Sequence, residues 1–195
     1  MRSFPWEERP VCFNYSTSYE LMLKSDGGSP IEGCPMANNA SKTNVTRLLA
    51  QRKIAFEALT YPDTLHSAEE VAEVLHKPLH QVFKTLVVLR EKGKPLLVVA
   101  PGGKQLDLRR LAAAIGEKKL RMATQREAEE LTGLLVGGIS ALALLHKGFD
   151  VYIDDSACGL EDLYVSGGQR GLNIHLSVAD FRRLTGAKPV PAAGD

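Results

Sequence analysis

Two glycine-rich segments toward the carboxyl end carry the residues best suited to chemistry. The first runs from Gly133 to Ser140 and reads GLLVGGIS, and the second runs from Tyr164 to Leu172 and reads YVSGGQRGL. Each combines bare backbone with a hydroxyl, and the second adds Arg170. Because glycine lets a ligand approach the main chain closely, such segments can present N–H groups to an anion or a carbonyl oxygen. They predict a pocket for a ligand that bears a phosphate or a carbonyl group.

Lys84 is a third candidate, because it heads the apolar run TLVVL. A strand here would bury the neighbours of Lys84 and leave its ammonium to reach solvent or to point into a cleft. The turn at Pro101 and Gly102 lies between a strand-like run and a helix-like run, where a phosphate could sit at a helix N-terminus. It lacks the P-loop spacing, and a tight turn explains it equally well.

Metal and triad chemistry are poorly supported. His76 and His80 are four residues apart, but Pro78 lies between them and no carboxylate or cysteine completes a tetrahedral set. The segment from Gly138 to Ser140 lacks the last glycine of a nucleophile elbow. We therefore predict no metal and no cofactor.

Adjacent carboxylates in a strand point to opposite faces, so Asp154 and Asp155 do not form an acid–base pair. We interpret them as solvent-exposed residues that keep a strand end soluble.

The elements that must position these residues follow from periodicity and cap signals. Ser67 with Glu70 and Thr124 with Glu127 have the capping-box pattern that opens a helix. Helices are predicted over about 43–53, 67–75, 107–115, 124–133 and 177–185. Strands are predicted over 55–61, 85–89, 96–100, 149–154, 163–166 and 172–176. Runs of adjacent strands imply antiparallel pairing, so the sequence predicts an α+β fold with a mixed, largely antiparallel sheet flanked by helices.

Composition predicts one globular domain with an appendage. The chain has 195 residues, of which 44% are hydrophobic and 24% charged. Residues 1–41 lack sustained periodicity and are predicted to be a disordered N-terminal extension, whereas residues 42–195 form a single domain. The chain shows no secretory signal pattern and no membrane-length apolar run, so we expect a cytoplasmic protein.

The net charge is only +1, and residues 42–195 carry +3. Any RNA binding must therefore use a local patch around a pocket.

Four motifs together resemble the YbaK family of trans-editing aminoacyl-tRNA deacylases, relatives of the editing domain inserted in bacterial prolyl-tRNA synthetases. They read VFKTL at 82–86, QLDL at 105–108, GGIS at 137–140 and YVSGGQRGL at 164–172, and the similarity extends from about 43 to 187. The resemblance implies a partly barrel-like sheet and a mischarged tRNA substrate, above all cysteinyl-tRNA(Pro).

The resemblance also implies the site. The family's lysine falls on Lys84, and its other motifs fall on the glycine segments and on the end of the first strand. The expected catalytic residues are Lys84, Gly137, Gly138, Ile139 and Ser140. The expected substrate-binding residues are Tyr61, Pro101, Gly102, Ser166, Gly167, Arg170 and Asn173. Two positions depart from the family: Ala141 replaces a usual proline, which would loosen the loop, and Asn173 replaces Asp or Gln.

This site suits a substrate that attacks itself. The thiol of cysteine, with a pKa near ~8.5, can attack the ester carbonyl and leave as a thiolactone. The enzyme then supplies orientation and backbone N–H groups for the developing oxyanion, and Lys84 with Arg170 would bind a terminal phosphate or stabilise charge.

Three alternatives stay open at this point: a water-dependent deacylase for alanyl-tRNA(Pro), one for seryl-tRNA, and a non-catalytic tRNA-binding module. The expected partner is the acceptor end of tRNA(Pro), with prolyl-tRNA synthetase as a candidate to hold the tRNA.

Overall fold

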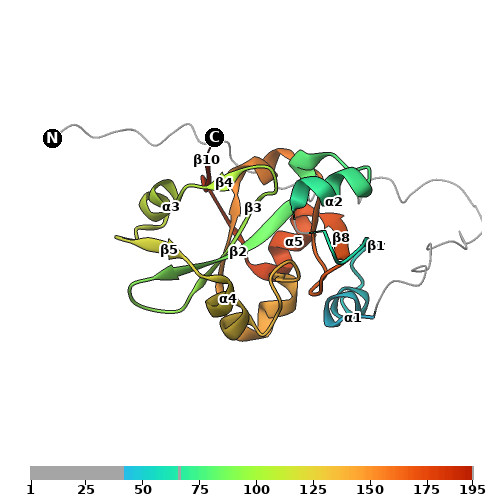
Figure 1. Ribbon diagram of the computed structural model, residues 1–195, viewed down its shortest axis with the longest axis horizontal. Coiled ribbons are helices and arrows are strands. Elements are labelled where there is room, and N and C mark those ends of the chain that lie inside the picture. The colour runs from blue at the N-terminus through green and yellow to red at the C-terminus, as the bar shows by residue number, and fades with distance from the viewer. Residues whose placement is uncertain (1–41, 66, 195) are drawn as a thin grey trace, which may run out of the picture. The chain divides into compact units, whose positions relative to one another are not determined.

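The computed structural model describes residues 42–65 and 67–194 (Figure 1). The predicted extension, residues 1–41, lies outside these ranges, so its separation from a domain over residues 42–195 stays a prediction. Within the described ranges, no helix is both long enough and apolar enough to cross a bilayer.

The helices begin where the cap residues predict. The α-helices are α1 (Asn44–Gln51), α2 (Ala68–Val74), α3 (Leu108–Ile115), α4 (Gln125–Thr132) and α5 (Val178–Thr185), and the 3-10 helices are η1 (Leu79–Gln81), η2 (Leu142–Lys147) and η3 (Asp155–Gly159). Both predicted capping boxes are confirmed. The Ser67 hydroxyl accepts from the Glu70 N–H at 3.1 Å while the Glu70 carboxylate accepts from the Ser67 N–H at 3.1 Å, and Thr124 with Glu127 repeats this exchange.

The strands form one large and two smaller sheets. Their bounds are β1 (Glu57–Thr60), β2 (Phe83–Arg90), β3 (Leu96–Pro101), β4 (Gln105–Leu106), β5 (Leu120–Met122), β6 (Asp150–Asp154), β7 (Asp162–Ser166), β8 (Leu172–Ser177), β9 (Lys188–Val190) and β10 (Ala193–Gly194). The five-stranded sheet has the order β5-β2-β3-β6-β9, the three-stranded sheet has the order β1-β8-β7, and β10 pairs with β4. The sequence did not predict β4, β5, β9 and β10, which are two or three residues long.

Most pairs are antiparallel, but β6 runs parallel to both β3 and β9. The rule that strands adjacent in sequence pair with each other is therefore wrong for β6, because β3 and β9 occupy its two edges and β7 pairs with β8 instead. An isolated parallel bridge between Val82 and Tyr164 links β2 to β7, so the two larger sheets meet at one edge. These features confirm the predicted mixed α+β class.

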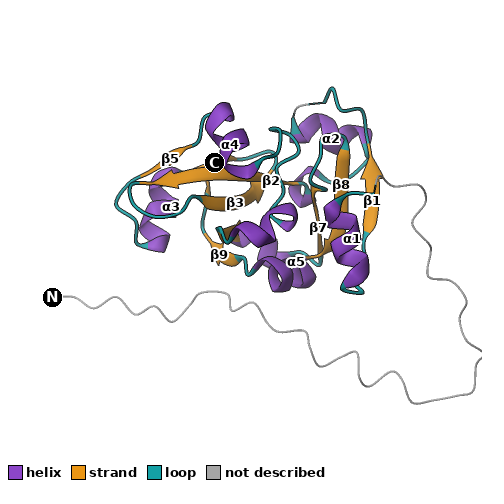
Figure 2. Ribbon diagram, turned by 90° about the horizontal axis from the view of Figure 1, so that it is seen from below, coloured by secondary structure: helices purple, strands orange, loops and turns teal. Residues whose placement is uncertain are grey.

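The main core lies where the five-stranded and three-stranded sheets face each other with α1 and α5 (Figure 2). A second core lies under α3, where Leu111 and Ala112 pack against Val88, Leu96 and Val98. Alternate residues of β2 therefore serve different cores, because successive side chains of a strand point to opposite faces.

Asp154 is buried, with 3% of its surface exposed, so the prediction that it keeps a strand end soluble is wrong. One carboxylate oxygen accepts the N–H groups of Ala192 at 2.9 Å and Ala193 at 2.6 Å, and the other accepts from Ser156. Burial alone would raise the pKa of Asp154, but hydrogen bonds from Ser156, Ala193 and Ala192 outweigh it and lower the pKa. Asp154 therefore fixes the C-terminal segment to the sheet.

Candidate functional site

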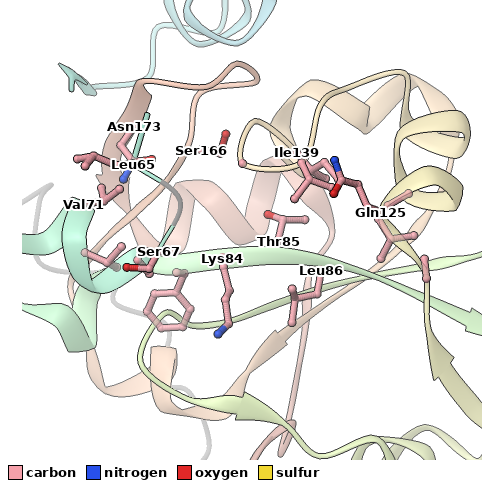
Figure 3. A pocket seen from close by; sticks show the side chains of 18 of the residues that line it. Leu65, Ser67, Val71, Lys84, Thr85, Leu86, Gln125, Ile139, Ser166 and Asn173 are labelled. Carbon is pink, nitrogen blue, oxygen red and sulfur yellow. The ribbon is translucent and has the colours of Figure 1, made fainter. Parts of the chain in front are cut away.

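A cavity of about 360 Å³ opens beside β2. Its walls come from β2, α2, the start of α4, the glycine-rich loop that follows α4, and the β7–β8 hairpin (Figure 3). Most lining side chains are apolar. The polar lining side chains are Tyr61, Ser67, Lys84, Thr85, Gln125, Ser166 and Asn173.

The structure brings half of the predicted site residues into this lining. These are Tyr61, Lys84, Gly137, Ile139, Ser166 and Asn173. The other six do not line it, and these are Pro101, Gly102, Gly138, Ser140, Gly167 and Arg170. The roles of all twelve stay predictions, but the second group is placed to support the walls of the pocket.

Lys84 lies in β2 and is half-buried. Its Nζ donates to the carbonyl oxygen of Gly102 at 2.9 Å. Lys84 and Thr85 leave opposite sides of the strand, as expected for neighbours in a strand (Figure 3). The contact with Gly102 fixes the ammonium of Lys84 without neutralising its charge.

Gly102 is a glycine because two elements meet there. A Cβ at this position would lie 2.3 Å from the Cβ of Ala68 in α2 and 3.0 Å from the carbonyl oxygen of Val82. The N–H of Gly102 also donates to that carbonyl at 2.7 Å. The bare backbone thus lets α2 approach the end of β3 and close one wall of the pocket.

The glycine-rich loop and the β7–β8 turn pack directly against each other. A Cβ on Gly138 would lie 2.8 Å from the carbonyl carbon of Gln169 and 2.9 Å from the amide nitrogen of Arg170. Arg170 Nε donates to the carbonyl oxygen of Val136 at 2.7 Å. Arg170 is therefore a brace for the loop in this structure.

Backbone donors in the loop are only partly available. The N–H of Gly138 donates to Leu135 within the loop at 2.8 Å. Gly137, which has a φ of +92°, lines the pocket together with Ile139. Ser140 is 1% exposed and lies behind them, and Ala141 follows with a φ of −60°, which is close to the angle that proline fixes.

Ser166 and Asn173 lie opposite each other in the β7–β8 hairpin and both line the pocket. Gly167 starts the turn, and its N–H donates to Leu172 at 2.8 Å. A Cβ on Gly167 would lie 2.6 Å from the Leu172 side chain. The turn therefore holds the Ser166 hydroxyl and the Asn173 amide side by side where β7 and β8 meet it.

Tyr61 enters the pocket from the end of β1, where its N–H donates to Gly171 at 3.0 Å. Burial raises the pKa of the Tyr61 phenol, and a backbone hydrogen bond from Gly171 opposes this rise only partly. The phenol therefore stays protonated at neutral pH and can donate a hydrogen bond.

Sequence reasoning missed Thr85, which lies below Ile139 and Ser166 in Figure 3. Its Oγ1 is buried and has no hydrogen-bond partner in the described part of the chain. A buried hydroxyl without a partner is costly, and such groups concentrate at functional sites. The sequence did offer one signal for Thr85. It directly follows Lys84 in a largely apolar strand, so the two polar side chains lie on opposite faces of that strand.

In residues 42–65 and 67–194, no three His, Cys, Asp or Glu side chains gather closely enough to hold a metal ion.

The family of the chain follows from comparison with known proteins. Residues 63–184 match the model of the aminoacyl-tRNA editing domain. The chain is 36% identical over 146 residues to EbsC of Enterococcus faecalis, whose name proposes a Cys-tRNA(Pro)/Cys-tRNA(Cys) deacylase, and this match covers 74% of the chain and 88% of EbsC. The chain therefore belongs to the aminoacyl-tRNA editing family, the YbaK-like class of aminoacyl-tRNA deacylases.

Other relatives agree with this assignment. A proline–tRNA ligase of Nitratidesulfovibrio vulgaris is 27% identical over 196 residues, covering 92% of the chain but only 33% of the ligase. The chain thus spans about a third of the length of that enzyme. A crystal structure described as a proposed trans-editing enzyme for prolyl-tRNA synthetase superposes with a TM-score of 0.69 and 26% identity, over 80% of this chain and all of that one.

Proposed function

We propose that this protein removes cysteine from Cys-tRNA(Pro), and that the thiol of the substrate is the nucleophile. The observation that carries the proposal is the composition of the pocket lining: apolar walls around one ammonium, one neutral phenol, three hydroxyls and two amides. Such groups can donate hydrogen bonds, but none of them is a carboxylate or imidazole that could serve as a general base. They suit orientation of a substrate and stabilisation of an oxyanion better than activation of a water molecule.

The proposed step is an internal displacement. The cysteine sulfur bonds to its own ester carbonyl carbon, the bond from that carbon to the ribose 3′-oxygen breaks, and the proton of the thiol replaces the lost bond on that oxygen through solvent. The products are a four-membered thiolactone and uncharged tRNA, and water then opens the thiolactone to free cysteine. The enzyme lowers the barrier by holding sulfur and carbonyl together, which effective-molarity measurements show to be a large effect.

The residues divide into two roles. Lys84 would turn from Gly102 toward the developing negative charge, and Gly137 with Ile139 would present backbone to the ester. Ser166 and Asn173 would bind the α-amino group or the terminal ribose, and Thr85 would gain in the substrate the hydrogen-bond partner that it lacks in the free protein. Gly102, Gly138 and Arg170 act as positioning residues, because they hold the walls of the pocket.

The proposed partner is the acceptor end of tRNA(Pro), and the proposed location is the cytoplasm, where charged tRNA is used in translation. Prolyl-tRNA synthetase is a candidate to deliver the tRNA, since the ligases that resemble this chain contain the same domain within a longer protein.

The test compares four substrates prepared on the same tRNA(Pro): cysteinyl, homocysteinyl, seryl and alanyl esters. We expect release from the two thiol-bearing esters and from neither of the others, together with a thiolactone product that mass spectrometry detects. Cleavage of alanyl- or seryl-tRNA without cleavage of the two thiol-bearing substrates would instead indicate a deacylase that uses water as its nucleophile. Binding of all four without cleavage would make it a binding module.

A further inference from the structure

Positive charge is concentrated in one stretch of the chain. Residues 91–121 contain eight Lys and Arg residues and three Asp and Glu residues, a net charge of +5, whereas the whole chain carries +1. All eight cations are exposed, and among the three acids only Glu91 is. We call these cations the basic lobe: Lys92, Lys94, Lys104, Arg109, Arg110, Lys118, Lys119 and Arg121.

The basic lobe is one region of the fold. It comprises the β2–β3 turn, the segment around β4, helix α3 and strand β5, which pairs with the end of β2. Both ribbon views place α3 and β5 at one end of the described domain, away from α1 (Figures 1 and 2). Arg121 is the most compensated member, because Glu127 binds it through two short hydrogen bonds of 2.8 and 2.7 Å.

The lobe continues the side of the sheet on which Lys84 lies. Lys84, Leu86 and Val88 share one face of β2, and α3 packs on Val88. Arg90, at the far end of the strand, lies six positions after Lys84, a distance of about 20 Å at the usual strand rise. The carbonyl that Lys84 contacts belongs to Gly102, two residues from Lys104 of the lobe.

The two helices that flank the pocket have the opposite charge. Helix α2 contributes Glu69, Glu70 and Glu73, all exposed, and no basic residue. Helix α4 contributes three glutamates and one arginine. A polyanion that reaches the pocket is therefore repelled from both helices and attracted toward the basic lobe.

We propose that the basic lobe binds the phosphates of the acceptor stem of the substrate tRNA while its 3′-terminal ester occupies the pocket. This inference rests on the proposed function. The low net charge of the chain does not oppose it, because duplex phosphates respond to the local density of cations. Lobe and pocket thus divide recognition: the lobe contacts the backbone of the stem and the pocket contacts the amino acid.

The test removes three lobe charges that form no ion pair or side-chain hydrogen bond in the described structure. The variant is Arg109→Ala/Lys118→Ala/Lys119→Ala. The matched control, Lys42→Ala/Arg47→Ala/Arg52→Ala, removes the same charge from exposed residues in α1 and on either side of it. Each protein is assayed on full-length Cys-tRNA(Pro) and on a cysteinylated CCA trinucleotide, and its affinity for uncharged tRNA is measured at several salt concentrations.

We expect the lobe variant to lose activity on full-length tRNA through a raised KM, and to cleave the trinucleotide as the wild type does. The salt slope of tRNA binding should fall by about one for each phosphate contact removed. The control should leave both substrates and the slope unchanged. Equal losses of activity in the two variants would overturn the proposal, because the change in net charge alone would then explain them. A lobe variant with the activity and tRNA affinity of the wild type would overturn it as well.

Failure of the proposed function is distinguishable from failure of this inference. A wild-type protein that cleaves neither substrate contradicts the deacylase proposal, whereas the binding measurements with uncharged tRNA still test the lobe.

Discussion

The ammonium of Lys84 and the carbonyl oxygen of Gly102 lie 2.9 Å apart, and the absence of a side chain on the same glycine lets α2 pack against the end of β3. One residue therefore orients the candidate catalytic cation and shapes a wall of the pocket. This relationship links a packing requirement to the chemistry of the site, and it can be tested at Gly102 without touching Lys84.

Gly102→Ala places a Cβ where the Cβ of Ala68 would be 2.3 Å away, so α2 or the β3 end must shift. We expect a loss of about 1–3 kcal/mol in the free energy of unfolding and a raised KM for the charged tRNA. Urea unfolding and steady-state deacylation measure both. Gly103→Ala is the control, because its new Cβ meets only the end of the Leu79 side chain, which is partly exposed and can move.

Arg170→Lys keeps the charge but removes the Nε that donates to Val136. We expect faster amide hydrogen exchange in residues 134–139 and a lower kcat/KM, with the free energy of unfolding changed by less than about 1 kcal/mol since Arg170 is partly exposed. Arg126→Lys, on the exposed side of α4, should leave exchange in the loop unaltered. Normal exchange in the loop of the Arg170 variant would show that the brace is dispensable.

Thr85→Val replaces the unpaired hydroxyl with a methyl group of similar size. Because Oγ1 is buried without a partner in the described structure, we expect the free protein to be as stable as the wild type or more stable, by up to about 1 kcal/mol. In contrast, kcat/KM should fall in Thr85→Val. Thr85→Ser keeps the hydroxyl and should partly restore kcat/KM. Thermal unfolding and deacylation rates together check this. A variant that gains stability and keeps full activity would exclude contact between the hydroxyl and the substrate.

Asp154→Asn weakens the acceptor for the N–H groups of Ala192 and Ala193, and we expect it to cost about 2–4 kcal/mol. The pKa of Asp154 is lowered in the folded protein, so its contribution is present above the ordinary value of 3.8 and is lost as the pH falls through the lower, folded value. The difference in unfolding free energy between wild type and variant should therefore be full at neutral pH, begin to narrow below about pH 4, and vanish only below the lowered pKa of the folded protein. Asp155→Asn, at the exposed neighbour, should leave stability unchanged.

The sequence predicted what local interactions determine. Ser67 and Thr124 mark helix starts because their side chains cap N–H groups only three residues away. Gly116 and Gly133 end α3 and α4 in the left-handed conformation that glycine favours. The same locality explains why the strands that contain Ser166 and Asn173 were predicted, and why the strand predicted over 85–89 lies within β2, which begins two residues earlier and includes Lys84.

Pairing between strands that are distant in the chain could not be predicted from the sequence. Strands β5 and β9 are three residues long and carry no period, so only their partners define them. The parallel position of β6 depends on its partners β3 and β9. The burial of Asp154 depends on a segment 38 residues further along the chain. The orphan hydroxyl of Thr85 and the acidic and basic sides of the pocket likewise emerge only when the chain is folded.

The central claim is that the pocket around Lys84 cleaves Cys-tRNA(Pro). The most direct measurement is the rate of cysteine release from purified Cys-tRNA(Pro) by wild type and by Lys84→Ala, with folding of the variant checked by its unfolding transition. We expect rapid release by the wild type and a loss of about 100-fold or more in the folded variant, as for removal of a group that stabilises an oxyanion. Equal release by both proteins would contradict the assignment of Lys84 to the site, and no release by the wild type would contradict the proposed function.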